Sequence, residues 1–367
     1  MLNNNTSIYI TTLMPRHGET GVNTHFNTCY KLLKDNGWND ENLFIITPYE
    51  GYRVIRAMLS RVVKIIGNIN KEIQVIFNRE YLYKFLKARL ESKIKEKNCK
   101  RNIIYAQDPL SAKAGLDLKR KGYPVEVILV VHFNNSQAWE VVEKGIAKEN
   151  GLLFNILNQL DREVMPNLDK IIFVSKYMEN QVITRVPETN KVSRYVIPNF
   201  IDFSPSSEDT EIQGDLITIG SLEPRKNHEF AIRLLYEIHK KGFPYTLTIV
   251  GQGDQKAKLQ KLVTKLGLEK YVSFAGYVPN ASRLIKNYKA YIHPSKMESF
   301  GLVLVEAMAN GKPVFSAPLG GMPEVYTENV EGRYIDINDP VKSAELIIEV
   351  LENKNMYNTL SQNAYKK

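Results

Sequence analysis

Cysteine is scarce in this sequence: Cys29 and Cys99 are the only two among 367 residues. Two cysteines cannot form a disulfide framework, and their spacing fits no metal site, which favours a reducing compartment. Long apolar runs are missing too, since none reaches the ~18 residues that a membrane span needs. The N-terminal stretch lacks the basic region and apolar core of a signal peptide. These absences together predict a cytoplasmic protein.

Acidic residues are scarce in one part of the chain, and that part carries the whole positive excess. The net charge is +9, and residues 53–101 hold 14 Lys/Arg against 4 Asp/Glu, a net of +10. Cationic and apolar residues alternate there near helical spacing, a pattern that can lie on an anionic membrane surface. A solvated helix face that shields a core edge explains the charge equally well. Nucleic acid is disfavoured because no nucleic-acid-binding motif accompanies the charge.

Apolar, β-rich runs alternate with helical patterns along the chain, which at 43% hydrophobic residues can bury a sizeable core. This alternation predicts an α/β protein with parallel, doubly wound sheets. It restarts near the Pro/Asn turn at 196–203, so we expect two Rossmann-like domains facing each other across a cleft. The expected strands are 7–13, 43–48, 73–77, 102–107, 125–132, 170–175, 216–221, 245–251, 272–277, 290–295 and 313–318.

The stretch GSLEPRKN, residues 220–227, indicates a strand end, a loop and a helix start. A strand is expected to end at Gly220, and a helix to begin near Asn227, a plausible N-cap. Arg225 and Lys226 then lie at the mouth of the helix, where free amides and the helix dipole already favour an anion. Two cations at that place are unfavourable without an anion, which points to a phosphate. The alternative interpretation is that both side chains point to solvent and bind no anion.

Two glutamates, Glu298 and Glu306, lie in the otherwise mostly apolar stretch MESFGLVLVEAMANG. The stretch predicts a loop followed by a helix that begins near Phe300 or Gly301. Glu306 shares its helix face with apolar neighbours, so we expect it to be buried or half-buried and hydrogen-bonded. At ~1.5 Å per residue the two carboxylates would lie roughly 12 Å apart, about the span of a diphosphate. One could therefore accept from ribose hydroxyls and the other from sugar hydroxyls.

Glycine-rich turns follow several other expected strands, at 250–254, 274–278 and 318–326. Each is a weak signal, but together they outline the rim of one cleft. In the first half, HGETGVNTHF at 17–26 is a candidate anion-binding loop without the GxGxxG pattern. His132 ends the most apolar strand, where a histidine is more often structural than catalytic.

Together these motifs resemble glycosyltransferase family 4, whose members are retaining, nucleotide-sugar-dependent enzymes of the GT-B fold. The resemblance is carried by HPS, FGL, two glutamates separated by seven residues, EAMANGKPV and GGMPEV. GSLEPRKN, VGQGD, FAGYV and IPNFID match in the same order. The likeness is strong over 216–326, weaker over 7–38, 128–133 and 171–202, and absent over 50–100.

The resemblance implies a division of the chain. Residues 1–197 would form the acceptor-binding domain, with the basic insertion at about 53–101. Residues 198–345 would bind the nucleotide sugar, and a C-terminal helix at 346–367 would return toward the first domain. The chain departs from the family in having Ser221 where many relatives have arginine and Phe200 where glycine is commoner. It also stops soon after LSQNAYKK, where relatives usually continue.

Roles for single residues also follow from the resemblance. Glu298 would contact the donor sugar, and His132 would line the sugar pocket. Arg225 and Lys226 would neutralise the diphosphate, so no metal or other cofactor would be needed. The implied donor-binding residues are Glu306 at the ribose, Tyr277 and Val278 near the base, Gly21 opposite the diphosphate, and Phe300, Gly301, Leu302, Val303, Gly220, Gly251 and Gly253.

We therefore expect a transferase that moves a hexose or N-acetylhexosamine from a UDP-sugar, or next from GDP-mannose, to a lipid-linked or growing cell-surface polysaccharide. Its place would be the cytoplasm, peripherally at the inner face of the cell membrane. Two alternatives stay open. A non-hydrolysing nucleotide-sugar epimerase would need acid and base residues at the sugar that the sequence does not identify. A non-catalytic sugar-binding partner need not keep Arg225, Lys226, Glu298 and Glu306 together.

Overall fold

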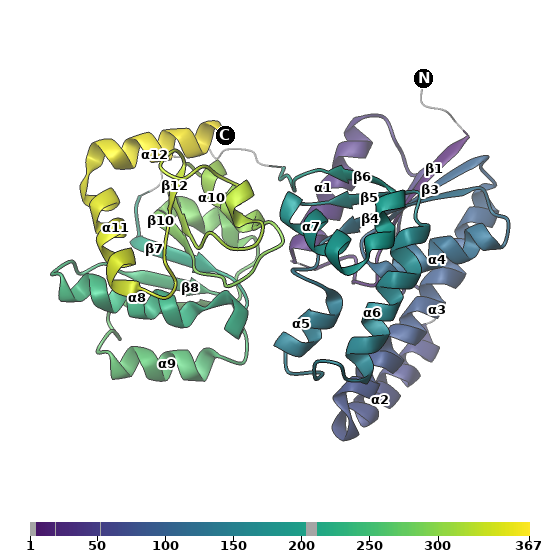
Figure 1. The fold of residues 1–367 in the computed structure, drawn as a ribbon, viewed down its shortest axis with the longest axis horizontal. Coiled ribbons are helices and arrows are strands. Elements are labelled where there is room, and N and C mark those ends of the chain that lie inside the picture. The colour runs from purple at the N-terminus through teal and green to yellow at the C-terminus, as the bar shows by residue number, and fades with distance from the viewer. Residues whose placement is uncertain (1–4, 19, 52, 203–210) are drawn as a thin grey trace. The chain divides into compact units, whose positions relative to one another are not determined.

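A computed structural model describes residues 5–18, 20–51, 53–202 and 211–367. Contacts divide the chain into two compact units, Met1–Asn199 and Phe200–Lys367 (Figure 1). The expected anion-binding loop at 17–26 and the expected linker at 196–203 each contain one residue, Glu19 and Phe203, outside the described parts.

The first unit is built on a six-stranded parallel sheet in the order β2-β1-β3-β4-β5-β6. In its register, Ile8 of β1 lies between Leu43 and Ile103 of the neighbouring strands. The elements are β1 (Thr6–Thr11), α1 (Gly21–Asp35), β2 (Leu43–Ile46), α2 (Arg53–Ile69), α3 (Lys71–Lys97), β3 (Arg101–Ala106), α4 (Pro109–Arg120), β4 (Val125–Val131), α5 (Gln137–Glu143), α6 (Leu152–Val164), β5 (Lys170–Phe173), α7 (Lys176–Arg185) and β6 (Ser193–Val196).

The second unit also contains a six-stranded parallel sheet, in the order β12-β11-β10-β7-β8-β9. Its core buries the apolar stripe of α8, including Phe230, Leu234 and Ile238, against the sheet. The elements are β7 (Gly214–Ile219), α8 (His228–Lys240), β8 (Leu247–Val250), α9 (Lys256–Lys265), β9 (Val272–Gly276), β10 (Tyr288–His293), α10 (Leu302–Ala309), β11 (Val314–Ser316), β12 (Gly332–Tyr334), α11 (Pro340–Glu352) and α12 (Lys354–Lys366).

Both sheets reverse their strand order once, between β1 and β3 in the first unit and between β7 and β10 in the second. In such sheets, ligands bind beyond the carboxyl ends of the strands at the point of reversal. A ligand-binding site in the second unit is therefore expected among the residues that follow Ile219 and His293.

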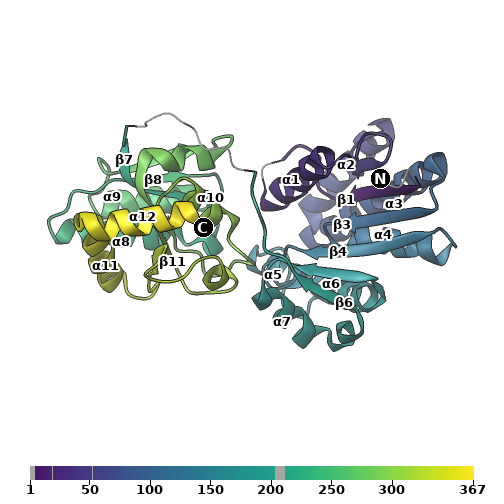
Figure 2. The ribbon, with the colours of Figure 1, turned by 90° about the horizontal axis from the view of Figure 1, so that it is seen from above.

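The structure corrects some of the expected elements. Residues 73–77 form no strand but lie within α3, because the Asn70 side chain accepts from the Ile73 amide and starts a helix there. The segment 346–367 is not one helix: it holds the end of α11 and all of α12. Figure 2 shows α12 lying over the second unit, where it contacts α10 and α11 of that same unit. Tyr357 of α12 donates to the Lys289 carbonyl at 2.9 Å.

Candidate active site

Arg225 and Lys226 lie on a short 3-10 helix, Pro224–Lys226, between β7 and α8. Asn227 joins this turn to α8 with a left-handed backbone, φ 54°, and its side chain caps no helix amide. Asn227 is thus the N-cap residue of α8, as predicted, but its left-handed backbone does not aim its side chain at the first amides as the extended backbone of a side-chain cap does. The turn brings both cations to the carboxyl edge of the sheet.

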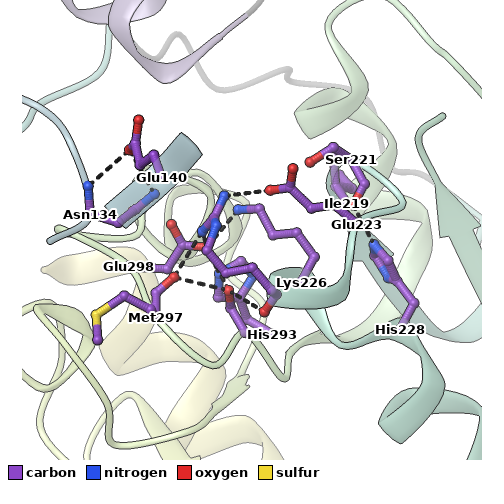
Figure 3. A network of polar contacts seen from close by, with 12 residues as sticks. Asn134, Glu140, Ile219, Ser221, Glu223, Lys226, His228, His293, Met297 and Glu298 are labelled. Atoms are coloured by element: carbon purple, nitrogen blue, oxygen red, sulfur yellow. Dashed lines mark hydrogen bonds and ion pairs between the residues drawn. The ribbon is translucent and has the colours of Figure 1, made fainter. Parts of the chain in front are cut away.

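The Glu298 carboxylate is buried, and four donor groups converge on its Oε1 atom (Figure 3). Lys226 Nζ donates at 2.5 Å and Ser295 Oγ at 2.8 Å. Arg225 Nη1 and His293 Nε2 each lie 3.1 Å from the same oxygen. Residues that follow β7 and residues that follow β10 thus meet at the point where the strand order reverses.

These contacts fix the charge of Glu298. Burial alone would raise the pKa of this carboxyl, but Lys226, His293 and Arg225 outweigh it and hold the pKa well below its usual range. Burial lowers the pKa of His293, and the nearby carboxylate offsets that only in part. At neutral pH the site therefore holds an ionised glutamate and a neutral histidine whose Nε2–H donates to it.

His293 is itself oriented from within the sheet. Its Nδ1 lies 3.1 Å from the hydroxyl of Tyr291, a fully buried residue of β10. The same hydroxyl lies 3.2 Å from the carbonyl of Ile219, the last residue of β7. In the sequence, HPS carries only the family resemblance, and no role for Tyr291, His293 or Ser295 follows from it. The available signal was the pair of polar residues, His293 and Ser295, at the end of an apolar strand.

The Arg225 guanidinium also contacts Met297 and Glu223. Its Nη1 donates to the Met297 carbonyl at 2.8 Å, and its Nη2 pairs with Glu223 at 2.7 Å. The sequence predicts a phosphate as the anion beside Arg225 and Lys226. The structure shows that Glu298 and Glu223 already supply negative charge at that place.

Glu306 lies on α10 and is half-buried, as the sequence predicted. Burial raises its pKa to about 7, and a hydrogen bond with the Ser282 side chain opposes that rise. Gly301 is the N-cap residue of α10 and has a left-handed backbone, φ 98°, which favours glycine. Leu302 and Phe300 are buried, and Val303 is half-buried. The two glutamates thus differ at neutral pH: Glu298 is ionised, whereas Glu306 is only partly ionised.

Three glycines of the predicted turns at 250–254 and 318–326 have a packing reason. A Cβ at Gly251 would lie 1.9 Å from the Gly220 carbonyl oxygen, and one at Gly253 would lie 2.5 Å from the Leu222 carbonyl oxygen. A Cβ at Gly320 would lie 2.3 Å from the Glu298 carbonyl oxygen. These turns are therefore packed backbone to backbone, which holds the ends of β7 and β8 together and fixes the backbone of Glu298. Tyr277 and Val278 follow β9, with Tyr277 exposed.

His132 follows β4 in the first unit, and its Nε2 lies 2.9 Å from Gln107 Oε1. Since that oxygen can only accept, Nε2 carries the proton. The His25 ring packs edge-on at 4.6 Å, and the Tyr105 hydroxyl lies 3.1 Å from His25 Nε2. Burial holds the pKa of His132 well below its usual range, so this histidine is neutral. Gly21 is the first residue of α1, after the N-cap Thr20.

Comparison with known proteins places the chain. The model of Glycosyltransferase Family 4 matches residues 21–204, and that of glycosyl transferases group 1 matches residues 201–367. The chain therefore belongs to glycosyltransferase family 4. An uncharacterized glycosyltransferase of Methanocaldococcus jannaschii is 29% identical over 54% of this chain and 54% of its own length. The N-acetyl-alpha-D-glucosaminyl L-malate synthase of Bacillus anthracis is 27% identical over 57% and 51%. The chain thus spans about half the length of these curated relatives.

Solved structures agree on the fold. HepE of Anabaena, in complex with UDP-glucose, gives a TM-score of 0.69 at 19% identity, over 98% of this chain and 93% of that one. Sucrose-phosphate synthase of Thermosynechococcus elongatus gives 0.71 at 18% identity, over 98% and 93%. The predicted fold class, an α/β protein with two Rossmann-like domains of the GT-B type, is confirmed.

In the described ranges, no helix is both long and apolar enough to span a bilayer. The same ranges contain no group of three or more His, Cys, Asp or Glu side chains placed to hold a metal ion.

Proposed function

We propose that this chain is a retaining glycosyltransferase that moves a hexose or N-acetylhexosamine from a nucleotide-diphosphate sugar. A UDP-sugar is the favoured donor and GDP-mannose the next. The acceptor would be a lipid-linked or growing cell-surface polysaccharide. The observation that carries the proposal is the cluster of Arg225, Lys226, His293 and Ser295 on the Glu298 carboxylate, at the sheet edge where such folds bind ligands.

The names of relatives support this choice of donor. Among the relatives are the Bacillus anthracis N-acetylglucosaminyl L-malate synthase and the poly(ribitol-phosphate) alpha-N-acetylglucosaminyltransferase of Staphylococcus aureus. HepE was solved with UDP-glucose. The first two names give different acceptors, so the likeness supports the donor class more than the acceptor.

In the proposed reaction, the bond between the anomeric carbon and the diphosphate oxygen breaks, and its electron pair leaves with the nucleoside diphosphate. The acceptor hydroxyl attacks from the same face and gives its proton to the departing phosphate, so the configuration is retained. Arg225 and Lys226 would stabilise the charge that develops on the diphosphate. Because both already pair with carboxylates, they are held in place before the donor binds.

The other roles follow the same geometry. Glu298 would accept a hydrogen bond from a sugar hydroxyl, and Glu306 from the ribose. His132 would line the sugar pocket as a neutral donor or acceptor, fixed in one tautomer by Gln107. Arg225 and Lys226 would stabilise the charge on the departing diphosphate, which a metal ion does in other enzymes. We therefore propose a metal-independent reaction, which activity undiminished by excess EDTA would support.

The test is a thermal-shift panel of nucleoside diphosphates and nucleotide sugars, followed by product analysis with and without acceptor. A ligand that binds only the folded protein raises the melting temperature by mass action. We expect selective stabilisation by UDP and UDP-sugars, and a loss of that shift in Lys226→Ala. A product formed without acceptor would indicate an epimerase. Stabilisation by no nucleotide would overturn the proposed donor site.

A further inference from the structure

The basic segment, residues 53–101, contains the helices α2 and α3, which differ in how far their side chains are buried. The longer helix, α3, buries Leu82, Leu86 and Leu90 in the first unit. Five of its eight cations have acidic partners, in the ion pairs Lys84–Glu80, Lys87–Asp117, Arg89–Glu50, Lys93–Glu96 and Lys95–Glu91. Most of the positive charge of α3 is therefore paired within the first unit, and α3 is a structural element.

The shorter helix, α2, leaves apolar side chains in solvent. The most exposed is Ile69 at 83%, and Met58 and Ile65 are each 62% exposed. At about 100° per residue, the exposed members fall within an arc of about 100° on one side of the helix. We call this surface the α2 stripe; its members are Val54, Ile55, Met58, Val62, Ile65 and Ile69. A contiguous apolar surface of this kind indicates an interaction site.

The stripe continues beyond α2. Ile73 at the start of α3 and Leu152 at the start of α6 are also exposed. The Leu153 amide donates to Glu72 Oε2 at 3.1 Å, which ties these two helix starts together. The start of α6 therefore lies close to the turn between α2 and α3, and Figure 1 shows these helices at the same end of the first unit.

The charge of α2 has one sign only. The helix has no acidic residue, and its cations are Arg53, Arg56, Arg61 and Lys64. Arg56 lies over the Tyr49 ring at 5.5 Å, whereas Arg61 and Lys64 are exposed beside the stripe. Apolar side chains beside exposed positive charge are complementary to the interface of an anionic bilayer.

We propose that the α2 stripe docks on a bilayer of anionic phospholipids, with its apolar side chains in the interface and Arg61 and Lys64 at the headgroups. A second copy of this chain fits less well, because two such faces would bring like charges together. Nucleic acid fits less well too, because apolar side chains fill the middle of the face. A transferase with the proposed function would bind a lipid-linked acceptor near this surface. The inference of membrane docking rests on the exposed side chains of α2 and does not depend on that function.

The test is flotation of the full chain with vesicles of phosphatidylcholine, with and without phosphatidylglycerol, in the absence of nucleotide. We expect flotation only with phosphatidylglycerol. The double variant Met58→Asp, Ile65→Asp should lower vesicle binding by at least about tenfold, and so should Arg61→Glu, Lys64→Glu. The double variant Met58→Gln, Ile65→Gln adds no charge and should lower vesicle binding by a smaller factor. All four positions are exposed, so melting temperatures should stay close to that of the unchanged protein.

The matched control is Lys256→Glu, Lys261→Glu, which makes the same change of charge at exposed positions of α9. It should bind vesicles like the unchanged protein. No flotation with phosphatidylglycerol would overturn the proposal, and so would full binding by Met58→Asp, Ile65→Asp. A dimer in sedimentation that this variant converts to a monomer would assign the stripe to a second copy instead. The thermal shift by UDP is measured without vesicles, so failure of one proposal is distinguishable from failure of the other.

Discussion

Gly21 is a glycine that the fold itself does not require. A Cβ there would meet no atom within 4 Å, whereas a Cβ at Gly251 would meet the Gly220 carbonyl oxygen at 1.9 Å. We expect Gly21→Ala to leave the melting temperature unchanged or slightly raised, since alanine is the better helix former. If the backbone at Gly21 approaches the donor diphosphate, the same change should raise KM for the donor by about tenfold, which is about 1.4 kcal/mol.

Kinetics and thermal unfolding of Gly21→Ala check this prediction together. Gly251→Ala is the comparison, because it should be destabilised whatever the ligand does. Unchanged donor kinetics in Gly21→Ala would remove Gly21 from the site.

Glu306 gives the protein a pH dependence that can be isolated. Its pKa is raised from 4.5 to about 7 in the folded state, so the folded protein holds this proton more tightly than the unfolded chain. Its contribution to stability is therefore fully present below pH 4.5 and is lost as the pH rises through 7. The loss amounts to about 3 kcal/mol.

Denaturant unfolding of the unchanged protein and of Glu306→Gln at pH 5 and pH 8 measures this effect. Because glutamine does not titrate, the unchanged protein should lose stability relative to the variant as the pH rises. Hydrogen bonds from a bound ribose would favour the ionised form of Glu306. UDP should therefore raise the free energy of unfolding of the unchanged protein more at pH 8 than at pH 6. A difference between the two proteins that is constant with pH would contradict the prediction.

At the site, the sequence predicts several of the residues involved but not the contacts between them. Arg225, Lys226 and Glu298 were predicted from charges beside a strand end and from an unpaired carboxylate in an apolar stretch. The structure joins them directly, which spacing could not show because 72 positions separate Lys226 from Glu298. The neutral His293 and its Tyr291 support were missed, since the orientation of a histidine depends on a hydroxyl that only the folded strand brings near.

At the scale of elements, the long apolar strands were predictable and the weak ones were not. Buried strands such as β4 and β7 show as apolar runs and were placed within a few residues. The missed strands β6 and β12 are short edge strands with sequences SRYV and GRY. An edge strand is covered on fewer sides, so it carries little apolar pattern. The run at 73–77 was assigned to a strand because five residues are too few to tell the two periods apart.

The helix α12 should support α10 and hence the donor side of the site. Leu360 is 2% exposed, and α12 contacts α10. We expect Leu360→Ala to lower the free energy of unfolding by about 2–5 kcal/mol, the usual cost of emptying a buried leucine site. The exposed Asn358→Ala on the same helix should change it by less than about 0.5 kcal/mol. Denaturant unfolding measures both, and equal effects would show that α12 is not packed as described.

At the scale of the whole molecule, the two units use the same plan but carry different surfaces. Each has a parallel sheet with one reversal of strand order, so each presents loops at one carboxyl edge. The first unit adds the basic helices α2 and α3, whereas the second holds the Glu298 cluster. A nucleoside diphosphate should therefore act mainly on the second unit and on one edge of its sheet.

Hydrogen exchange of the full chain with and without UDP tests that localisation. Protection should be greatest at 220–227 and 295–306, because the amides beyond β7 and β10 and at the start of α10 would meet the ligand. Segments at the opposite edge, such as 241–246 and 268–271, precede β8 and β9 and should exchange at the same rate in both states. Protection confined to those segments would place the nucleotide at the wrong edge of the sheet for the Glu298 cluster, and the proposed donor site would have to be abandoned.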